Sequence, residues 1–185
     1  LFTILAAWIA TTLDGSSAEW RLTWSDEFDK PGLPDKAKWS YETGFVRNNE
    51  LQLYTRDRPE NARIENGLLV IEGRNERYAN PGYQPGGDSK RSRRSGVEFA
   101  DYTAASLITE GKASFLYGRV EVRAKLPHGN GVWPAIWMMG TNRVTVGWPR
   151  CGEVDIMEFV GKEPDRVHAN VHYSQGGKHA SKGGK

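Results

Sequence analysis

The sequence is short of cysteine and of any excess of charge, and each shortage excludes a class of protein. Cys151 is the only cysteine among 185 residues, so no disulfide can form within the chain. The chain has 25 Lys and Arg against 23 Asp and Glu, a formal net charge of +2. This balance gives no reason to expect nucleic acid or an anionic membrane as a partner.

Long apolar runs are also rare, and the clearest one lies at the N-terminus. Residues 1–13 are mostly apolar, too short to span a bilayer comfortably but suited to the core of a signal peptide. The small residues 16–18 then offer a cleavage site. We therefore predict a signal peptide over residues 1–18 that begins before Leu1, and a protein that is secreted, periplasmic or extracellular and free of the membrane after cleavage. A buried N-terminal helix is the alternative.

Aromatic residues and glycine, in contrast, are plentiful. The chain has 7 Trp and 21 Gly, and its aromatic content is 11%. Tryptophan presents a large flat surface that stacks well on the apolar face of a sugar ring. The same rings also fill the cores of β-rich domains, so composition alone leaves both interpretations open.

Alternation of polar and apolar side chains predicts many short strands. The clearest case is residues 117–126, where Val120 and Val122 alternate with charged residues and predict a half-buried antiparallel strand. The other predicted strands lie at residues 20–28, 48–54, 68–72, 105–109, 132–139 and 167–173.

Two stretches do not fit this pattern. Residues 75–101 contain several Pro and Gly and the basic run 90–94, and we interpret them as a long solvated loop. Residues 174–185 are rich in Gly and Lys and predict a loop with no closing strand. No helical pattern follows the signal. The sequence therefore predicts an all-β sandwich or β-jelly roll over residues 19–185, and we expect the chain to end inside that domain.

The most informative stretch runs from Gly152 to Gly161, where three acids alternate with large apolar residues. In a β-strand, Glu153 and Asp155 share one face. Glu158 lies at an odd offset from Glu153 and would point to the opposite face. One extra residue at Met157, a β-bulge, would return Glu158 to the face of the other two acids.

Three crowded carboxylates suggest acid–base chemistry. Their mutual repulsion is expected to raise one pKa, and a charged carboxylate beside a protonated one is the equipment of glycoside hydrolysis. The strand spacing separates the two glutamate backbones by about 13 Å, and side chains leaning inward can bring the carboxyl groups to the ~5.5 Å of retaining glycosidases. Three acids can also bind calcium, but the neighbouring tryptophans fit a sugar cleft better, so we predict no metal at this site.

The Glu-x-Asp-x-x-Glu pattern of Glu153, Asp155 and Glu158 resembles the active-site strand of glycoside hydrolase family 16 in its bulged, laminarinase-like form. Other segments resemble the family in the expected order, and together they cover most of residues 20–175. These segments are Trp24-Ser25-Asp26-Glu27-Phe28, Asn48-Asn49-Glu50-Leu51-Gln52, Tyr117-Gly118-Arg119, the Trp-Pro-Ala-x-Trp-Met run within 131–140, and Trp148-Pro149-Arg150-Cys151-Gly152.

The resemblance implies a concanavalin A-like β-jelly roll whose concave sheet forms an open cleft. It implies that Glu153 is the nucleophile, Glu158 the general acid and then base, and Asp155 the assisting residue between them. By the same resemblance the sugar would be bound by Trp133, Trp137, Trp148, His172 and, more weakly, Asn48. It further implies that no cofactor takes part in the chemistry; a structural calcium occurs in the family, but its ligands are not identifiable here.

The predicted function is that of a secreted, retaining, endo-acting glycosidase that binds and hydrolyses β-1,3-glucan or mixed-linkage β-glucan as a monomer. Three alternatives use the same scaffold: a galactan hydrolase of the agarase or carrageenase kind, a transglycosylase, and a non-catalytic β-glucan-binding protein. The intact Glu153 and Glu158 argue against the last. One departure from the family pattern is Ser106, which stands where many relatives carry an Arg and leaves the substrate preference open.

The 185-residue chain on its own is predicted to be unstable or inactive, because strands left without partners expose their backbone polar groups. Urea unfolding and a reducing-end assay on laminarin check this expectation. Cooperative unfolding together with glucanase activity of the 185-residue chain would contradict it.

Overall fold

The computed structural model describes residues 19–88 and 94–184. The predicted signal peptide (1–18) and most of the basic run lie outside the described residues. The described chain is almost entirely β, as predicted. Its strands are β1 (Ser40–Glu42), β2 (Gln52–Tyr54), β3 (Ala62–Glu65), β4 (Leu68–Ile71), β5 (Arg74–Ala79), β6 (Phe99–Ala104), β7 (Ser106–Ile108), β8 (Ala135–Met139), β9 (Glu153–Glu158), β10 (His168–Gln175) and β11 (Lys178–Gly184).

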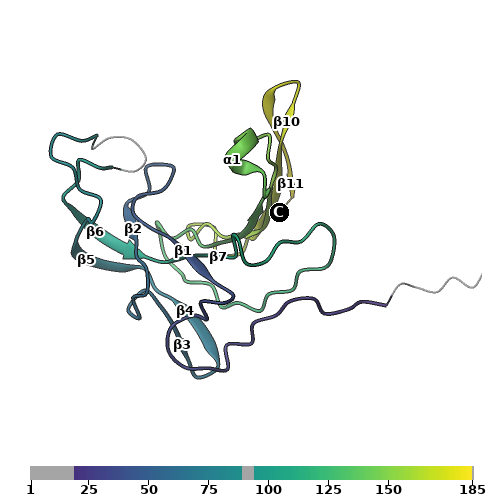
Figure 1. The fold of residues 1–185 in the computed structure, drawn as a ribbon, viewed down its shortest axis with the longest axis horizontal. Helices are drawn as coiled ribbons and strands as arrows, with labels where there is room; N and C mark the ends of the chain where they lie inside the picture. Colours follow the sequence, from purple (N-terminus) through teal and green to yellow (C-terminus); the bar gives the residue numbers. More distant parts are fainter. Residues whose placement is uncertain (1–18, 89–93, 185) are drawn as a thin grey trace, which may run out of the picture.

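The strands form one four-stranded sheet and three smaller ones. The large sheet has the order β11-β10-β9-β8, and all of its pairs are antiparallel. The smaller sheets have the orders β2-β6-β5, β1-β7 and β3-β4. The two groups lie side by side in Figure 1, with β10, β11 and α1 to one side of β2, β5 and β6.

The smaller sheets hold most of the buried apolar residues. Phe45, Leu53 and Ala100 are at most 5% exposed and pack together, with Leu53 on β2 and Ala100 on β6. A second cluster joins Tyr41 of β1 to Ala62 of β3. Burial of these side chains, at about 25 cal/mol per Å² of apolar surface, holds the small sheets together.

A buried polar network lies beside this core. Asn61 and Thr103 are fully buried, and the amide of Asn61 donates to the Thr103 hydroxyl at 2.9 Å. Arg58 donates to Asn61 at 2.7 Å and makes a two-pronged ion pair with Glu76 at 2.6 and 2.9 Å. Thr103 also donates to Glu76. Because every polar group here has a partner, the network ties β5 and β6 to the loop before β3.

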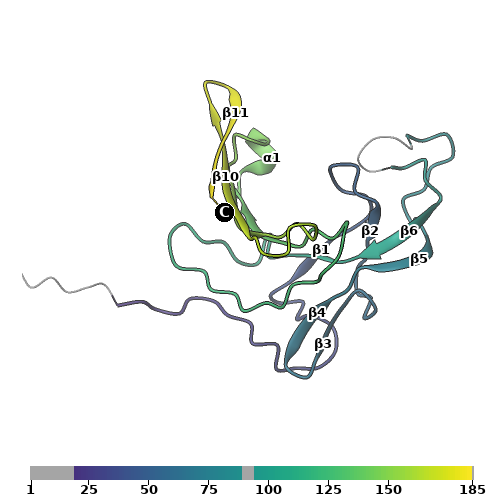
Figure 2. The same ribbon diagram turned by 180° about the vertical axis from the view of Figure 1, so that it is seen from behind.

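Two predicted strands are not formed. Residues 117–126 run as an extended segment, with Val120 and Val122 about half exposed (47% and 55%), and no strand of the described chain pairs with them (Figure 2). Residues 20–28 likewise form no strand; Trp24 instead packs edge-on against Trp39 at 5.5 Å. Alternation marks a face that can be buried, but a strand also needs a hydrogen-bonding partner.

Strands also form at two places where the sequence predicted loops. Residues 174–185 were expected to be a loop, yet β11 pairs with β10 along its whole length through the turn at Gly176 and Gly177, both with positive φ. The predicted long loop at 75–101 contains most of β5 and the start of β6. In both cases backbone pairing outweighs an unfavourable side-chain pattern.

The described residues include one short helix, α1 (Arg143–Val146), between β8 and β9. Within the described ranges, no helix has both the length and the apolar character needed to cross a membrane.

Replacing Glu76 with Gln is expected to destabilise the full-length protein by about 2 kcal/mol at pH 7, the scale of a partly buried charged hydrogen bond. The hydrogen bond from Arg58, followed by that from Thr103, lowers the pKa of Glu76 from 4.5 to about 2. A lowered folded-state pKa contributes stability above pH 4.5, and this contribution is lost as the pH falls towards 2. The difference in free energy of unfolding between the two proteins should therefore shrink over that range.

Glu60 provides the matched control, because its carboxylate also faces Arg58, at 3.5 Å, but is 53% exposed. Glu60→Gln should change the free energy of unfolding by less than about 1 kcal/mol. Equal effects of the two substitutions at pH 7, measured by urea unfolding, would show that the buried network does not stabilise the small sheets.

Candidate active site

The three acids of β9 lie on one face of the large sheet, as predicted. Against β8, Glu153 pairs with Met139, Asp155 with Trp137 and Glu158 with Ala135. Directly paired residues share a face of the sheet. The register shifts once, between Asp155 and Met157, so a β-bulge is confirmed.

The bulge lies one position earlier than predicted. Met157 pairs with Ile136 of β8, and the residue without a partner in that register is Ile156. Against β10, the step from Asn170 to His168 spans both bulged residues. The outcome for the acids is the one expected: the extra residue returns Glu158 to the face of Glu153 and Asp155.

Glycine allows the chain to pack closely at the end of β9. A Cβ on Gly161 would lie 1.9 Å from the carbonyl oxygen of Gly129 and 2.4 Å from a methyl group of Val132. Gly161 also donates its N–H to the carbonyl of Val132 at 2.9 Å. A larger residue would push this turn away and disturb the segment that carries Trp133.

Each of the two outer glutamates accepts a hydrogen bond from an exposed tryptophan. Trp148 Nε1 donates to Glu153 Oε2 at 2.7 Å, and Trp133 Nε1 donates to Glu158 Oε1 at 3.1 Å. The two indoles are 51% and 65% exposed. They come from the loops before β9 and β8, so the two carboxylates are flanked by accessible aromatic surface.

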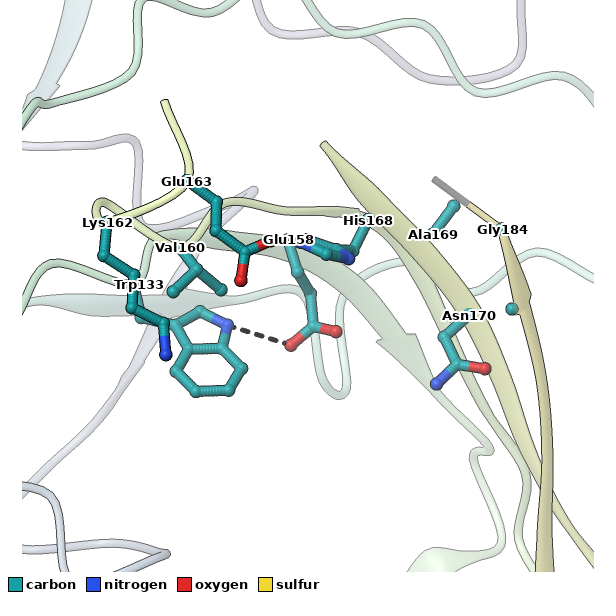
Figure 3. Close-up of a pocket in the computed structure, with 10 residues that line it drawn as sticks. Trp133, Glu158, Val160, Lys162, Glu163, His168, Ala169, Asn170 and Gly184 are labelled. Carbon is teal, nitrogen blue, oxygen red and sulfur yellow. Dashed lines mark hydrogen bonds and ion pairs between the residues drawn. The ribbon is translucent and has the colours of Figure 1, made fainter. Parts of the chain in front are cut away.

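Glu158 lines a pocket of about 450 Å³. Figure 3 shows the Trp133 indole pointing at the Glu158 carboxylate, with Asn170 across the opening. His168 and Glu163 also line this pocket, with His168 Nε2 3.2 Å from Glu163 Oε2. The pocket therefore presents a carboxylate beside an aromatic face and several polar side chains, a combination suited to a sugar.

Asp155 is the most buried of the three acids, with 4% of its surface exposed. Burial raises the pKa of Asp155, and the negative charge of Glu153 and a hydrogen bond with it raise that pKa further. His172 acts in the opposite direction, with its Nε2 3.1 Å from Asp155 Oδ2. The sequence predicted that crowding would raise one pKa in this cluster, and Asp155 is a residue where it does.

Two residues predicted to bind sugar, Trp148 and His172, are linked to each other by His179. Nδ1 of His172 lies 2.9 Å from Nε2 of His179, and the two rings stack with centroids 5.1 Å apart. The His179 ring also packs on Trp148, at 4.6 Å between centroids. His179 belongs to β11, which was predicted to be a loop, and no sequence pattern singled it out.

Trp137 lies on the acidic face, but one of its faces is covered. The guanidinium of Arg47 lies 5.2 Å from the centre of the Trp137 ring and forms an ion pair with Glu42. Glu42 also accepts a hydrogen bond from Ser106 at 2.6 Å. The cation–π contact draws the loop before β2 to the large sheet.

Asn48 is not brought to this site. It lies in the turn before β2 with a φ of +53°, its side chain is exposed, and no contact with the acidic strand is found among the described residues. Its neighbour Arg47 reaches Trp137 of β8 instead. No local pattern pointed to Arg47, because its importance depends on a ring 90 positions away.

The donor atoms of Glu153, Asp155 and His172 lie within 4.8 Å of one another. One of the three is an imidazole nitrogen, whereas calcium prefers a shell of oxygen ligands. Glu158 is not a member of this group, since it faces Trp133. The arrangement therefore fits paired acid–base groups better than a calcium site.

Several known proteins are similar to this chain in sequence and in fold. A β-glucanase of Rhodothermus marinus is 51% identical over 158 residues, which cover 83% of this chain and 48% of that protein. A keratan-sulfate endo-1,4-β-galactosidase of Sphingobacterium multivorum is 37% identical over 179 residues, 94% of this chain and 37% of that protein. The chain thus spans about half, or less, of the length of these relatives.

The structure of the laminarinase from Rhodothermus marinus superposes with a TM-score of 0.71 at 44% identity, covering 89% of this chain and 61% of that one. The described chain is almost entirely strand, and together with this similarity it identifies the fold as the β-jelly roll that the sequence predicted. The family model described as glycosyl hydrolases family 16 matches residues 37–184, four-fifths of the sequence, and the chain therefore belongs to glycosyl hydrolase family 16.

Proposed function

We propose that the protein is a retaining, endo-acting glycosidase that hydrolyses β-1,3-glucan or mixed-linkage β-glucan. The observation that carries this proposal is the bulged β9, which presents Glu153 and Glu158 on one face with an exposed indole hydrogen-bonded to each. The names of the relatives, a β-glucanase and a laminarinase, support the choice of glucan.

Glu153 is the proposed nucleophile. Its Oε2 accepts the Trp148 indole N–H, and its carboxylate attacks the anomeric carbon. As the new bond forms, the bond from the anomeric carbon to the glycosidic oxygen breaks, and the sugar becomes an ester of Glu153. A carboxylate that already accepts one hydrogen bond is held in one orientation for this attack.

Glu158 is the proposed general acid and then base. Its Oε1 accepts the Trp133 indole N–H, so the proton for the leaving oxygen is placed on Oε2. In the second step the same carboxylate takes a proton from water, and the resulting hydroxide displaces Glu153 from the anomeric carbon. Retention of configuration follows from the two successive inversions.

Asp155 lies between them and compensates for changes in charge. While Glu153 is ionised, its charge favours the protonated form of Asp155, which is the direction in which the pKa of Asp155 is shifted. When the ester forms, the charge of Glu153 disappears, and the ionised form of Asp155 beside His172 becomes more favourable.

The substrate is proposed to lie across the large sheet, stacked on exposed indoles. Trp133 and Trp148 offer accessible rings at the two ends of β9, whereas Arg47 covers one face of Trp137. A row of rings beside a strand suits cleavage inside a long chain. We also propose that the protein is secreted and acts as a monomer without a cofactor in the reaction.

An endo-β-galactosidase is the second candidate. It is favoured by the 37% identity to the keratan-sulfate enzyme over 94% of this chain. The same two glutamates would act, and the sugar-binding contacts would decide the substrate. Activity on agarose, carrageenan or keratan sulfate without activity on laminarin or lichenan would select it.

Glu153→Gln and Glu158→Gln, made in the full-length protein, are each expected to lower the hydrolysis of laminarin and lichenan by about 10²–10⁴-fold. Reducing ends released per minute are the measurement. With an aryl β-glucoside whose leaving group needs no proton, Glu158→Gln should regain much of the rate of the first step, while Glu153→Gln should not.

Glu110 supplies a control, since it is exposed and forms an ion pair with Arg143 of α1. Glu110→Gln should leave hydrolysis within twofold of the unmodified protein. Undiminished hydrolysis of polysaccharide by both β9 variants would contradict the roles assigned to Glu153 and Glu158.

A further inference from the structure

His179 lies beside the acidic cluster but has no role in the proposed acid–base chemistry or in sugar stacking. It contacts both His172 and Trp148, the two residues that hold Asp155 and Glu153. Its Nε2 is 2.9 Å from His172 Nδ1, and its ring centroid is 4.6 Å from that of Trp148. His172 in turn faces Asp155, and Trp148 donates to Glu153. The contacts form a chain that begins at one carboxylate of β9 and ends at another.

The proton positions within this chain can be assigned from the groups that face one another. His172 Nε2 lies 3.1 Å from both Asp155 Oδ2 and the amide nitrogen of Asn170. The Asn170 amide can only donate to Nε2 and the Asp155 carboxylate can only accept from it; a hydrogen bond to a charged carboxylate is the stronger of the two, so we place the hydrogen of Nε2 between His172 and Asp155. Nδ1 of a neutral His172 is then an acceptor, and His179 must supply the hydrogen from its own Nε2.

We propose that His179 is a positioning residue of this active site. Through its Nε2 hydrogen it holds His172 in the tautomer that faces Asp155, and through its ring it keeps the Trp148 indole against Glu153. The proposal deepens the proposed glycosidase function, and its kinetic part rests on that function.

The arrangement also limits the charge that the pair can carry. Two imidazolium rings with nitrogens 2.9 Å apart would repel strongly and have no acceptor between them, so this contact requires an accepting nitrogen on one of the two rings. The titratable groups that face His172 are Asp155 and Glu153 on β9 and His179 on β11; the loop before β9 contributes Trp148, which does not titrate. A hydrogen bond from His179 therefore occupies Nδ1 of His172 on the side of the ring away from Asp155.

Two substitutions separate the two roles. His179→Phe keeps a ring for Trp148 and removes the N–H, and His179→Gln keeps an N–H at a similar distance and removes the ring. For His179→Phe we expect kcat on laminarin to fall about 10-fold with KM nearly unchanged, the scale of one charge-assisted hydrogen bond. Its acid limb should move to higher pH, because Nδ1 of His172 is free to take up a proton.

For His179→Gln we expect the opposite pattern. The pH–rate profile should be nearly unchanged, and KM should rise several-fold because Trp148 is less ordered. Lys182→Gln is the control, because Lys182 is on β11 but pairs with Val171 and so faces the other side of the sheet. It should alter neither quantity. Identical kinetics for His179→Phe, His179→Gln and the unmodified full-length protein would overturn the proposal.

A second measurement does not depend on activity. Two-bond ¹H–¹⁵N correlation spectra of the full-length protein report the tautomer of each histidine, and the chain has only four. We expect the Nε2–H form for His172, retained in His179→Gln and lost or mixed in His179→Phe. The Nδ1–H form of His172 in the unmodified protein would overturn the proposal even if the glucanase is active. The expected spectra from a protein without glucanase activity would refute only the proposed function.

Discussion

The position of Glu158 depends on one extra residue in β9. In an unbroken strand, Glu158 would face away from Glu153, because an offset of five residues changes the side of the sheet. The unpaired Ile156 cancels that change, and all three acids then face the same side as Trp137 of β8. Glu153 and Asp155 share this face without the bulge, so the bulge is what adds Glu158 and its hydrogen bond with Trp133 to the site.

The acids are held by residues from other parts of the large sheet and its loops. Trp133 and Trp148 fix one oxygen of each outer glutamate, and His172 meets Asp155 from β10. Arg47 reaches Trp137 from the loop before β2 and links the large sheet to the smaller ones. The site therefore combines one strand that carries the reacting groups with neighbours that orient them.

Alternation and motif order were enough to predict the all-β class, the acidic face and its bulge. The bulge was predicted one residue late, at Met157, because only the register against β8 shows that Ile156 is skipped. The strand at 117–126 was predicted wrongly and β11 was missed, since strand formation depends on a pairing partner as well as on side chains. Contacts such as that of Arg47 with Trp137 join distant positions, and no local pattern records them.

The stereochemistry of hydrolysis tests the central claim that Glu153 and Glu158 act as nucleophile and acid–base on one face of β9. Proton NMR of the first products released from laminarin by the full-length protein, recorded before mutarotation, distinguishes the two anomers directly. The account predicts that the β-anomer appears first, because two displacements at the anomeric carbon retain its configuration. Initial release of the α-anomer would mean a single displacement by water and would contradict it.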